Sequence, residues 1–342
     1  MNFKDYKLKR GDKVAVIAPS SGKAEKFPHV YKQGIKNIEE IFGLTVVEYP
    51  TAKMSDNQLY NNPKLRAEDI NKAFADSSIR GIITTIGGDD SVRILPFLDK
   101  NTIKKNPKLF MGYSDASVLL VFLNQLGLVS FHGPSVMAGF AQTRNLPKSF
   151  ENHVNNLLFG DFEVFEYSSY QEYCDGYKDW GRPENSGDIN NLKANDGWHW
   201  INGENEVSGI LFGGCIEALE FLKSTIYWPS KDFWHGKIVF LETSEEKPTI
   251  EQVKRMLRNY GTQGVFQKIS ALFFGRPNFY SDSEKQELEK MILNIVVNEF
   301  GATELPIITN MDFGHTDPQL IIPLGVNVIV NFEAKSIKLL TK

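Results

Sequence analysis

Short apolar runs rich in valine and isoleucine alternate with helix-like stretches through the first 125 residues. Four runs have the length and β-branched content of buried strands: residues 14–18, 44–48, 81–86 and 108–111. Three stretches between or after them repeat apolar side chains at helical spacing: residues 30–42, a stretch from Pro63, and residues 114–125. This alternation is typical of a parallel sheet covered by helices. We therefore predict an N-terminal doubly wound, mostly parallel α/β layer.

The alternation stops near residue 140. Residues 167–203 form a long stretch rich in Asn, Asp, Gly and aromatic residues, and irregular segments of that length are usually functional. Strand and helix patterns then resume, with strands expected at 208–214, 237–241, 269–274 and 306–309 and helices at 216–223, 249–260 and 283–300. The 342 residues suit two domains. We predict an N-terminal α/β domain at 1–165 and a second, smaller α/β domain at 166–342.

Composition excludes several classes of protein. The chain has 38 Lys and Arg against 42 Asp and Glu, and the absence of a basic block argues against nucleic acid as a partner. Cys174 and Cys215 belong to no Cys/His cluster, so we expect no disulfide framework and no structural zinc site. We also expect no metal and no cofactor in the functional site. The charged N-terminus lacks the apolar core of a signal peptide, and no run approaches the ~20 apolar residues of a membrane span. We expect a cytoplasmic protein with no membrane partner.

Chemically capable residues follow four of the predicted strands. The carboxyl ends of parallel strands share one edge of a sheet, where ligands bind in open α/β folds. The four segments are Gly87-Gly88-Asp89-Asp90, Gly112-Tyr113-Ser114-Asp115, Glu242, and the turn from Asp312 to His315. We expect the functional site at this edge.

Ser114 lies in a sequence close to the nucleophile elbow G-x-S-x-G, with Ala116 in place of the last glycine. Such a turn points the serine Oγ out of the sheet and directs the N–H of Asp115 toward a developing oxyanion. A second N–H could come from Gly88. A serine directly before a helix is also the commonest helix cap, and that role explains Ser114 from its position alone.

His315 lies in a polar turn, where an imidazole is available as a general base. His132 is its nearest competitor among the six histidines. Glu242 ends an apolar run, so its carboxylate should be partly buried and in need of a partner. In a triad it would accept the Nδ1–H of His315. Glu245 and Glu246 follow closely and could take that role instead.

Two other interpretations concern the glycine loop and the aromatic stretch. Gly87-Gly88-Asp89-Asp90 is also reminiscent of the phosphate-binding loops of NAD kinases and phosphofructokinases, although a glycine pair after a strand is a weak signal. Aromatic residues between 167 and 203, among them Trp180 and Trp198, could stack on a flat substrate group. Hydrophobic anchoring of the segment explains them equally well.

The order Ser114, Glu242, His315, with several longer matches, resembles the LD-carboxypeptidase family of serine peptidases. The matches span nearly the whole chain: residues 11–21, 86–88, 112–115, 131–134, 209–214, 240–242, 314–316 and 323–325. The resemblance implies a two-domain homodimeric enzyme with a Ser/His/Glu triad at the domain interface. It also implies metal-independent hydrolysis of an amide near the terminus of a small-molecule or short-peptide substrate.

The family includes cytoplasmic enzymes that remove the terminal D-Ala from murein tetrapeptides. A related branch, the microcin C immunity peptidases, cuts the carboxamide between an acyl or peptidyl group and a nucleotide. This sequence is more similar to the second branch, because Leu241-Glu242-Thr243-Ser244 differs from the Leu-Glu-Asp run of the murein enzymes and the Trp-bearing loop resembles a nucleobase-stacking segment. We expect Gly87, Trp180 and Trp198 to contact the substrate. A protein that only sequesters such a conjugate is a further possibility.

Overall fold

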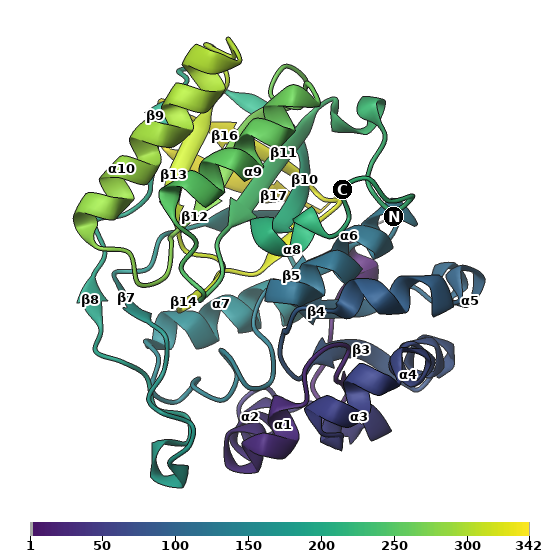
Figure 1. Cartoon of the computed structure of the whole chain (residues 1–342). Coiled ribbons are helices and arrows are strands. Elements are labelled where there is room, and N and C mark those ends of the chain that lie inside the picture. The colour runs from purple at the N-terminus through teal and green to yellow at the C-terminus, as the bar shows by residue number, and fades with distance from the viewer. Residues whose placement is uncertain (1–2, 342) are drawn as a thin grey trace.

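A computed structural model describes residues 3–341, which form two large sheets and one small three-stranded sheet, with helices packed around them (Figure 1). The first sheet has six strands in the order β15-β5-β4-β3-β1-β2. Five of them run parallel: β1 (Lys13–Ile17), β2 (Thr45–Glu48), β3 (Ile79–Thr84), β4 (Leu109–Gly112) and β5 (Ser130–His132). The strand order reverses between β1 and β3, the position at which doubly wound folds bind ligands.

Seven α-helices accompany the first sheet within the described residues. They are α1 (Lys23–Lys26), α2 (Pro28–Glu40), α3 (Asp56–Asn61), α4 (Pro63–Ala75), α5 (Lys100–Lys105), α6 (Ser117–Gln125) and α7 (Lys148–Phe159). Pro63 takes the first turn of α4, where a missing N–H costs no helical hydrogen bond. α6 is buried almost all round, because it lies between the first sheet and the elements of the second.

The second sheet has eight strands in the order β6-β17-β16-β10-β11-β12-β13-β9. Its parallel centre is β10 (Val207–Cys215), β11 (Lys237–Glu242), β12 (Ala271–Gly275) and β13 (Ile307–Met311). Antiparallel strands complete it: β6 (Val164–Tyr167), β9 (His199–Asn202), β16 (Asn327–Asn331) and β17 (Ser336–Leu340). Its helices are α8 (Ile216–Glu220), α9 (Ile250–Thr262) and α10 (Asp282–Leu293), the last continued by a π-helix at Asn294–Glu299.

The two sheets are joined by chain crossings and by close packing. β15 (Ile322–Leu324) leaves the C-terminal part of the chain and pairs antiparallel with β5 of the first sheet. α6 lies beside α8 and β10 (Figure 1), where the Cys215 N–H donates a hydrogen bond of 3.0 Å to Ser117 Oγ. A Cβ at Gly214 would lie 2.6 Å from that same oxygen. The buried apolar residues of both sheets therefore form one continuous core.

The α/β class and the mostly parallel N-terminal sheet are confirmed, but three expectations need correction. The second sheet has eight strands and the first has six, so the C-terminal sheet is not the smaller of the two. The proposed division after residue 165 falls inside β6. The stretch at 167–203 is not loop throughout, because β7 (Glu172–Asp175) and β8 (Lys193–Ala194) pair there and β7 also pairs with β14 (Thr316–Asp317).

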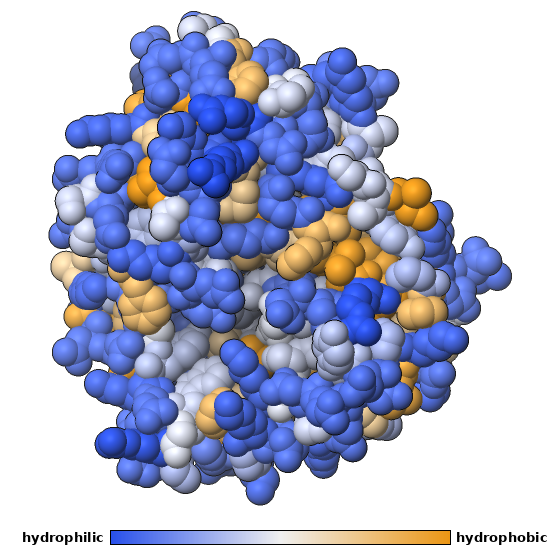
Figure 2. All heavy atoms as spheres, in the orientation of Figure 1, coloured by the Kyte–Doolittle hydropathy of each residue, from blue (hydrophilic) through white to orange (hydrophobic). Residues whose placement is uncertain are grey.

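The molecular surface is mostly hydrophilic on the face shown in Figure 2, with apolar side chains gathered toward its right-hand side. Phe221 and Ile226, in the segment after α8, are among the exposed large apolar residues. None of the helices within residues 3–341 combines the length and apolarity needed to cross a membrane.

Candidate active site

Ser114 occupies a strained turn at the carboxyl end of β4. Its φ is +61°, in the left-handed region that residues other than glycine rarely adopt. The helix-cap explanation does not hold, because the N-cap of the Ser114–Ala116 turn is Tyr113 and that of α6 is Ala116. Strain of this kind clusters at functional sites. The geometry supports the nucleophile-elbow interpretation.

The glycine loop after β3 packs directly on this elbow. A Cβ at Gly87 would lie 2.8 Å from Ser114 Oγ and 3.4 Å from the Asp115 nitrogen, so only glycine fits there. The Gly87 carbonyl accepts hydrogen bonds from the N–H (3.2 Å) and the hydroxyl (2.7 Å) of Ser21, in the loop after β1. Gly88 has a φ of +155° and lies against Ser20. The loops that follow β1, β3 and β4 are thus held in contact with one another.

Asp115 holds these loops through a buried carboxylate. Its Oδ2 accepts hydrogen bonds from Ser20 Oγ at 2.6 Å and from the Ser91 N–H at 2.8 Å. Burial raises the pKa of Asp115 above its ordinary value, although these hydrogen bonds oppose the rise. Within residues 3–341, the backbone N–H groups of Gly88 and Asp115 donate to no protein acceptor. Both remain free for an acceptor on a bound molecule.

Glu242 and His315 meet at the carboxyl edge of the second sheet. Glu242 is the last residue of β11, His315 follows β13, and Glu242 Oε2 lies 2.7 Å from His315 Nδ1. Gly314 makes this approach possible, since its φ is +98° and a Cβ there would lie 2.5 Å from Glu242 Oε2. Burial alone would raise the pKa of Glu242, but the charge of His315 brings it below its ordinary value.

The other candidate histidine and acids occupy different positions around this pair. His132, fully buried on β5, lies behind Glu242 with its Nε2 3.5 Å from Oε1. Glu245 Oε2 lies 3.0 Å from His315 Nε2, on the opposite side of the imidazole from Glu242. The Glu246 side chain is exposed and takes part in none of the ion pairs of the described residues. Glu242 is therefore the acid at Nδ1.

The two flanking carboxylates change the protonation of His315. Burial lowers the pKa of the imidazole, but Glu242 and Glu245 outweigh burial and raise it to about 10. The same contact lowers the pKa of Glu245 to about 2. His315 is thus an imidazolium in this arrangement at neutral pH.

Ser114 and His315 line one cavity of about 280 Å³ between the two sheets. The Tyr113 ring packs edge-on against the His315 ring at 4.9 Å between centroids. The described residues that line the cavity are Lys23, Ile86, Gly87, Gly88, Tyr113, Ser114, Ala138, Gly176, Tyr177, Lys178, Trp180, Glu245, Asn278, Phe279 and His315. The nucleophile candidate, the base candidate and the glycine loop therefore share one space.

Trp180 and Tyr177 form an aromatic wall of the cavity. Their rings stack with centroids 5.5 Å apart and planes 16° from parallel, and Phe27 packs edge-on against Trp180. His29 Nε2 lies 2.8 Å from the Trp180 carbonyl, and the Tyr177 hydroxyl donates to Asp317. The wall is thus tied to both halves of the chain.

Trp198 does not join that wall. It is absent from the described residues that line the cavity, and its indole N–H donates a 2.8 Å hydrogen bond to Asp312 Oδ2. Asp312 also accepts hydrogen bonds from Asn195 (3.1 Å) and Arg276 (2.7 Å) on Oδ1. The structure therefore does not support the expected substrate contact of Trp198, because its ring lies outside the cavity lining and is held on Asp312 instead.

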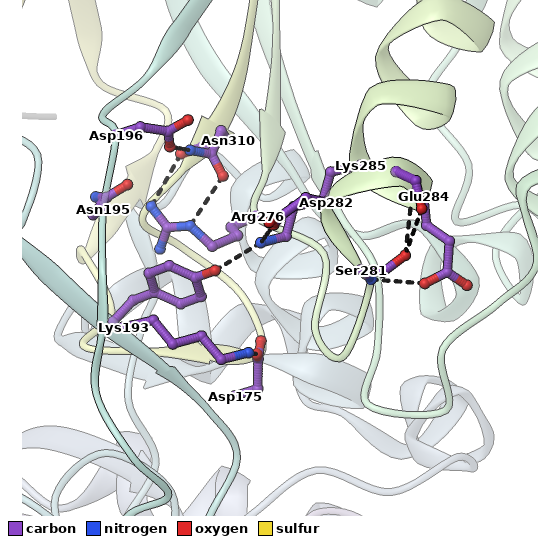
Figure 3. A network of polar contacts seen from close by, with 12 residues as sticks. Asp175, Lys193, Asn195, Asp196, Arg276, Ser281, Asp282, Glu284, Lys285 and Asn310 are labelled. Atoms are coloured by element: carbon purple, nitrogen blue, oxygen red, sulfur yellow. Dashed lines mark hydrogen bonds and ion pairs between the residues drawn. The ribbon is translucent and has the colours of Figure 1, made fainter.

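The segment that carries the aromatic wall is held to the second sheet by polar contacts, shown in Figure 3. Arg276 Nε donates to Asn310 Oδ1 at 3.0 Å, and Asn310 Nδ2 donates to Asp196 at 3.0 Å. Lys193 pairs with Asp175 at 2.5 Å. Arg276 and Asn310 are not among the predicted site residues, although both lie at the carboxyl ends of predicted strands, which is the position that singled out Glu242.

Known protein families match both halves of the chain. The LD-carboxypeptidase N-terminal domain matches residues 14–133, and the LD-carboxypeptidase C-terminal domain matches residues 208–330. The chain belongs to the LD-carboxypeptidase family. This LD-carboxypeptidase homologue is accordingly a member of a family of serine peptidases, and the predicted resemblance is confirmed.

Relatives extend the match to nearly the full length. The microcin C7 self-immunity protein MccF of Escherichia coli is 26% identical over 96% of this chain and 93% of its own. A probable murein peptide carboxypeptidase of Bacillus subtilis is 26% identical over 98% of this chain and 94% of its own. The solved structure of an MccF-like protein from Streptococcus pneumoniae in complex with AMP superposes with a TM-score of 0.85, at 28% identity, covering 96% of this chain and 98% of that one.

Proposed function

We propose that this LD-carboxypeptidase homologue hydrolyses a carboxamide with a Ser114-His315-Glu242 triad. The observation that carries the proposal is the pairing of His315 Nδ1 with buried Glu242 at 2.7 Å, beside a cavity shared with strained Ser114. A carboxylate at Nδ1 fixes the tautomer whose Nε2 can accept a proton. The arrangement fits acyl transfer to a serine.

In the first half of the reaction, Ser114 Oγ attacks the scissile carbonyl carbon while His315 Nε2 takes the hydroxyl proton. The free N–H groups of Gly88 and Asp115 stabilise the oxyanion, for which fixed backbone donors are well suited. The tetrahedral intermediate collapses, the C–N bond breaks, and His315 gives the proton to the leaving nitrogen. Water then attacks the acyl-serine with His315 as base, which releases the acid and restores Ser114.

For the substrate we propose an acyl or peptidyl group joined by a carboxamide to an adenylate-like nucleotide. The stacked Trp180 and Tyr177 on the cavity wall support this choice, because a flat purine gains contact area on an aromatic face. The MccF-like relative solved with AMP has the same fold along nearly its whole length. We also propose that the enzyme acts in the cytoplasm as a homodimer.

A murein tetrapeptide is the second candidate substrate, supported by the likeness to the probable murein peptide carboxypeptidase. The kinase interpretation has less support, because Asp90 is held by Arg66 at 2.6 Å and by Arg93 at 2.8 Å. Because the Asp90 carboxylate already forms ion pairs with two guanidinium groups, it is poorly placed to bind magnesium.

The test is to incubate the protein with an aminoacyl sulfamoyl adenosine and with a murein tetrapeptide, and to identify products by mass spectrometry. We expect cleavage of the nucleotide conjugate, and we expect Ser114→Ala to lower kcat by about 10⁴-fold or more without loss of fold. Unchanged turnover by Ser114→Ala would refute the triad. Cleavage of the tetrapeptide alone would select the murein substrate, and retention of intact conjugate would indicate a binding protein.

A further inference from the structure

Glu245 stands where the catalytic cycle needs an open imidazole nitrogen. Its Oε2 lies 3.0 Å from His315 Nε2, the nitrogen that must receive the Ser114 proton. The contact is an ion pair without hydrogen-bond alignment, and within residues 3–341 this buried nitrogen has no hydrogen-bond partner. As long as the carboxylate stays, it holds the proton on His315. The resting geometry therefore opposes the first step of the reaction.

The Glu245 side chain is free to leave this position. It is 53% exposed, whereas the side chain of Glu242 is fully buried. Ion pairs with an exposed partner are weak, because water solvates the separated charges well. A charge brought by the substrate can therefore compete for the carboxylate.

Glu245 is also the one carboxylate among the described residues that line the cavity, and the lining includes Lys23 and Lys178. The scissile carbonyl must lie within hydrogen-bond reach of the Ser114–His315 pair. Groups on both sides of that carbonyl therefore lie near His315 Nε2 and Glu245. In a nucleotide conjugate the leaving side carries no cation, so a cation near Glu245 has to come from the carbon on the acyl side. The lysines suit anionic groups of a substrate, and Glu245 suits a cation.

We propose that Glu245 selects substrates with a free ammonium group on the carbon next to the scissile carbonyl, and that pairing with this ammonium draws the carboxylate off His315 Nε2. The inference rests on the proposed function and narrows its substrate class. An aminoacyl nucleotide with a free α-amino group meets the requirement. The same conjugate acylated on that nitrogen does not.

Other charged groups around His315 remain in place during this exchange. Glu242 approaches His315 from β11, and His132 of β5 lies behind Glu242. Asp317 of β14 faces the His315 ring, and the positive charge of Lys23 of α1 lowers the pKa of Glu245. The phenol groups of Tyr113 and Tyr177 complete the surroundings. With Glu245 removed, the raised pKa of His315 should fall, since one of its two flanking carboxylates is lost. The base then becomes available at lower pH.

The test compares an aminoacyl sulfamoyl adenosine with its N-acetylated form, using the wild type, Glu245→Gln and the matched control Glu246→Gln. We expect the wild type and the control to favour the free amine at least tenfold in kcat/KM. Glu245→Gln should lose that preference, and its kcat/KM should rise at lower pH than in the wild type. Equal use of both substrates by the wild type, or an unchanged preference in Glu245→Gln, would overturn the proposal.

A binding experiment separates this inference from the proposed function. Calorimetry with Ser114→Ala and with Ser114→Ala/Glu245→Gln measures affinity for the same two compounds without turnover. A tenfold preference for the free amine that disappears in the double variant supports Glu245 even if the wild type cleaves neither compound. Equal affinities, or no binding of either compound, would overturn the inference whatever the outcome for catalysis.

Discussion

At the scale of single residues, His315 is defined by the carboxylates on either side of its ring. Glu242 at Nδ1 is fully buried and Glu245 at Nε2 is half exposed. The first contact lies inside the core, while the second is the contact that we propose is exchanged for substrate. The His315 imidazole thus has one buried acid partner, Glu242, and one exposed acid partner, Glu245.

The pH dependence of stability follows from this environment. The folded-state pKa of His315 is raised from 6.5 to about 10, so its bound proton stabilises the fold fully below pH 6.5 and is lost as pH rises toward 10. We expect the unfolding free energy of the wild type to fall across this window by a few kcal/mol relative to His315→Asn. Urea titrations at several pH values measure the difference. Parallel curves for the two proteins would contradict it.

At the scale of elements, the segment between β6 and β10 depends on Asp312. This buried carboxylate accepts hydrogen bonds from the Tyr170 N–H, Asn195, Trp198 and Arg276. Arg276 is itself fully buried. Asp312, in the turn two residues before Gly314, therefore positions the segment that carries Trp180.

Replacing Asp312 tests this dependence. Asp312→Ala leaves the Arg276 charge buried without its acid, so we expect a loss of about 3–5 kcal/mol of unfolding free energy. Hydrogen exchange should quicken at residues 170–198. The matched control is Lys338→Ala, which removes an exposed ion pair with Glu166 and should cost no more than about 1 kcal/mol. Equal effects of the two substitutions would show that Asp312 does not hold the loop.

At the scale of the whole molecule, the two sheets share one core. β15 crosses from the C-terminal part into the first sheet, and the buried apolar residues of both sheets are contiguous. The proposed triad requires both sheets, because Ser114 belongs to the first sheet and its two proposed partners belong to the second.

Cooperative unfolding is the expected consequence. All five tryptophans lie at residue 180 or beyond, so their fluorescence reports on the C-terminal part, whereas far-ultraviolet circular dichroism reports on both parts. We expect the two signals to give one coincident transition in urea, since neither sheet keeps its core without the other. Separate midpoints would show that the halves unfold independently.

Sequence patterns predicted local features well where each depends on neighbours along the chain. The parallel strands, the elbow at Ser114 and the strand-end positions of Glu242 and His315 are in this class. α7 was missed even though Phe150, Val154, Leu157 and Leu158 repeat at helical spacing. The predicted strand 81–86 lies two residues late relative to β3, because Arg80 interrupts the apolar pattern at its start and the β-branched residues Thr85 and Ile86 continue past its end.

The sequence by itself thus determined which segments become strands and which chemical groups stand at their ends, since side-chain periodicity and turn preference act over a few residues. Only the tertiary structure decided that Glu242 meets Nδ1 while Glu245 meets Nε2, that Trp180 lines the cavity and that Trp198 turns to Asp312. These pairings join residues brought together by the packing of two sheets, and no local pattern encodes which of several nearby acids or aromatic rings that packing selects.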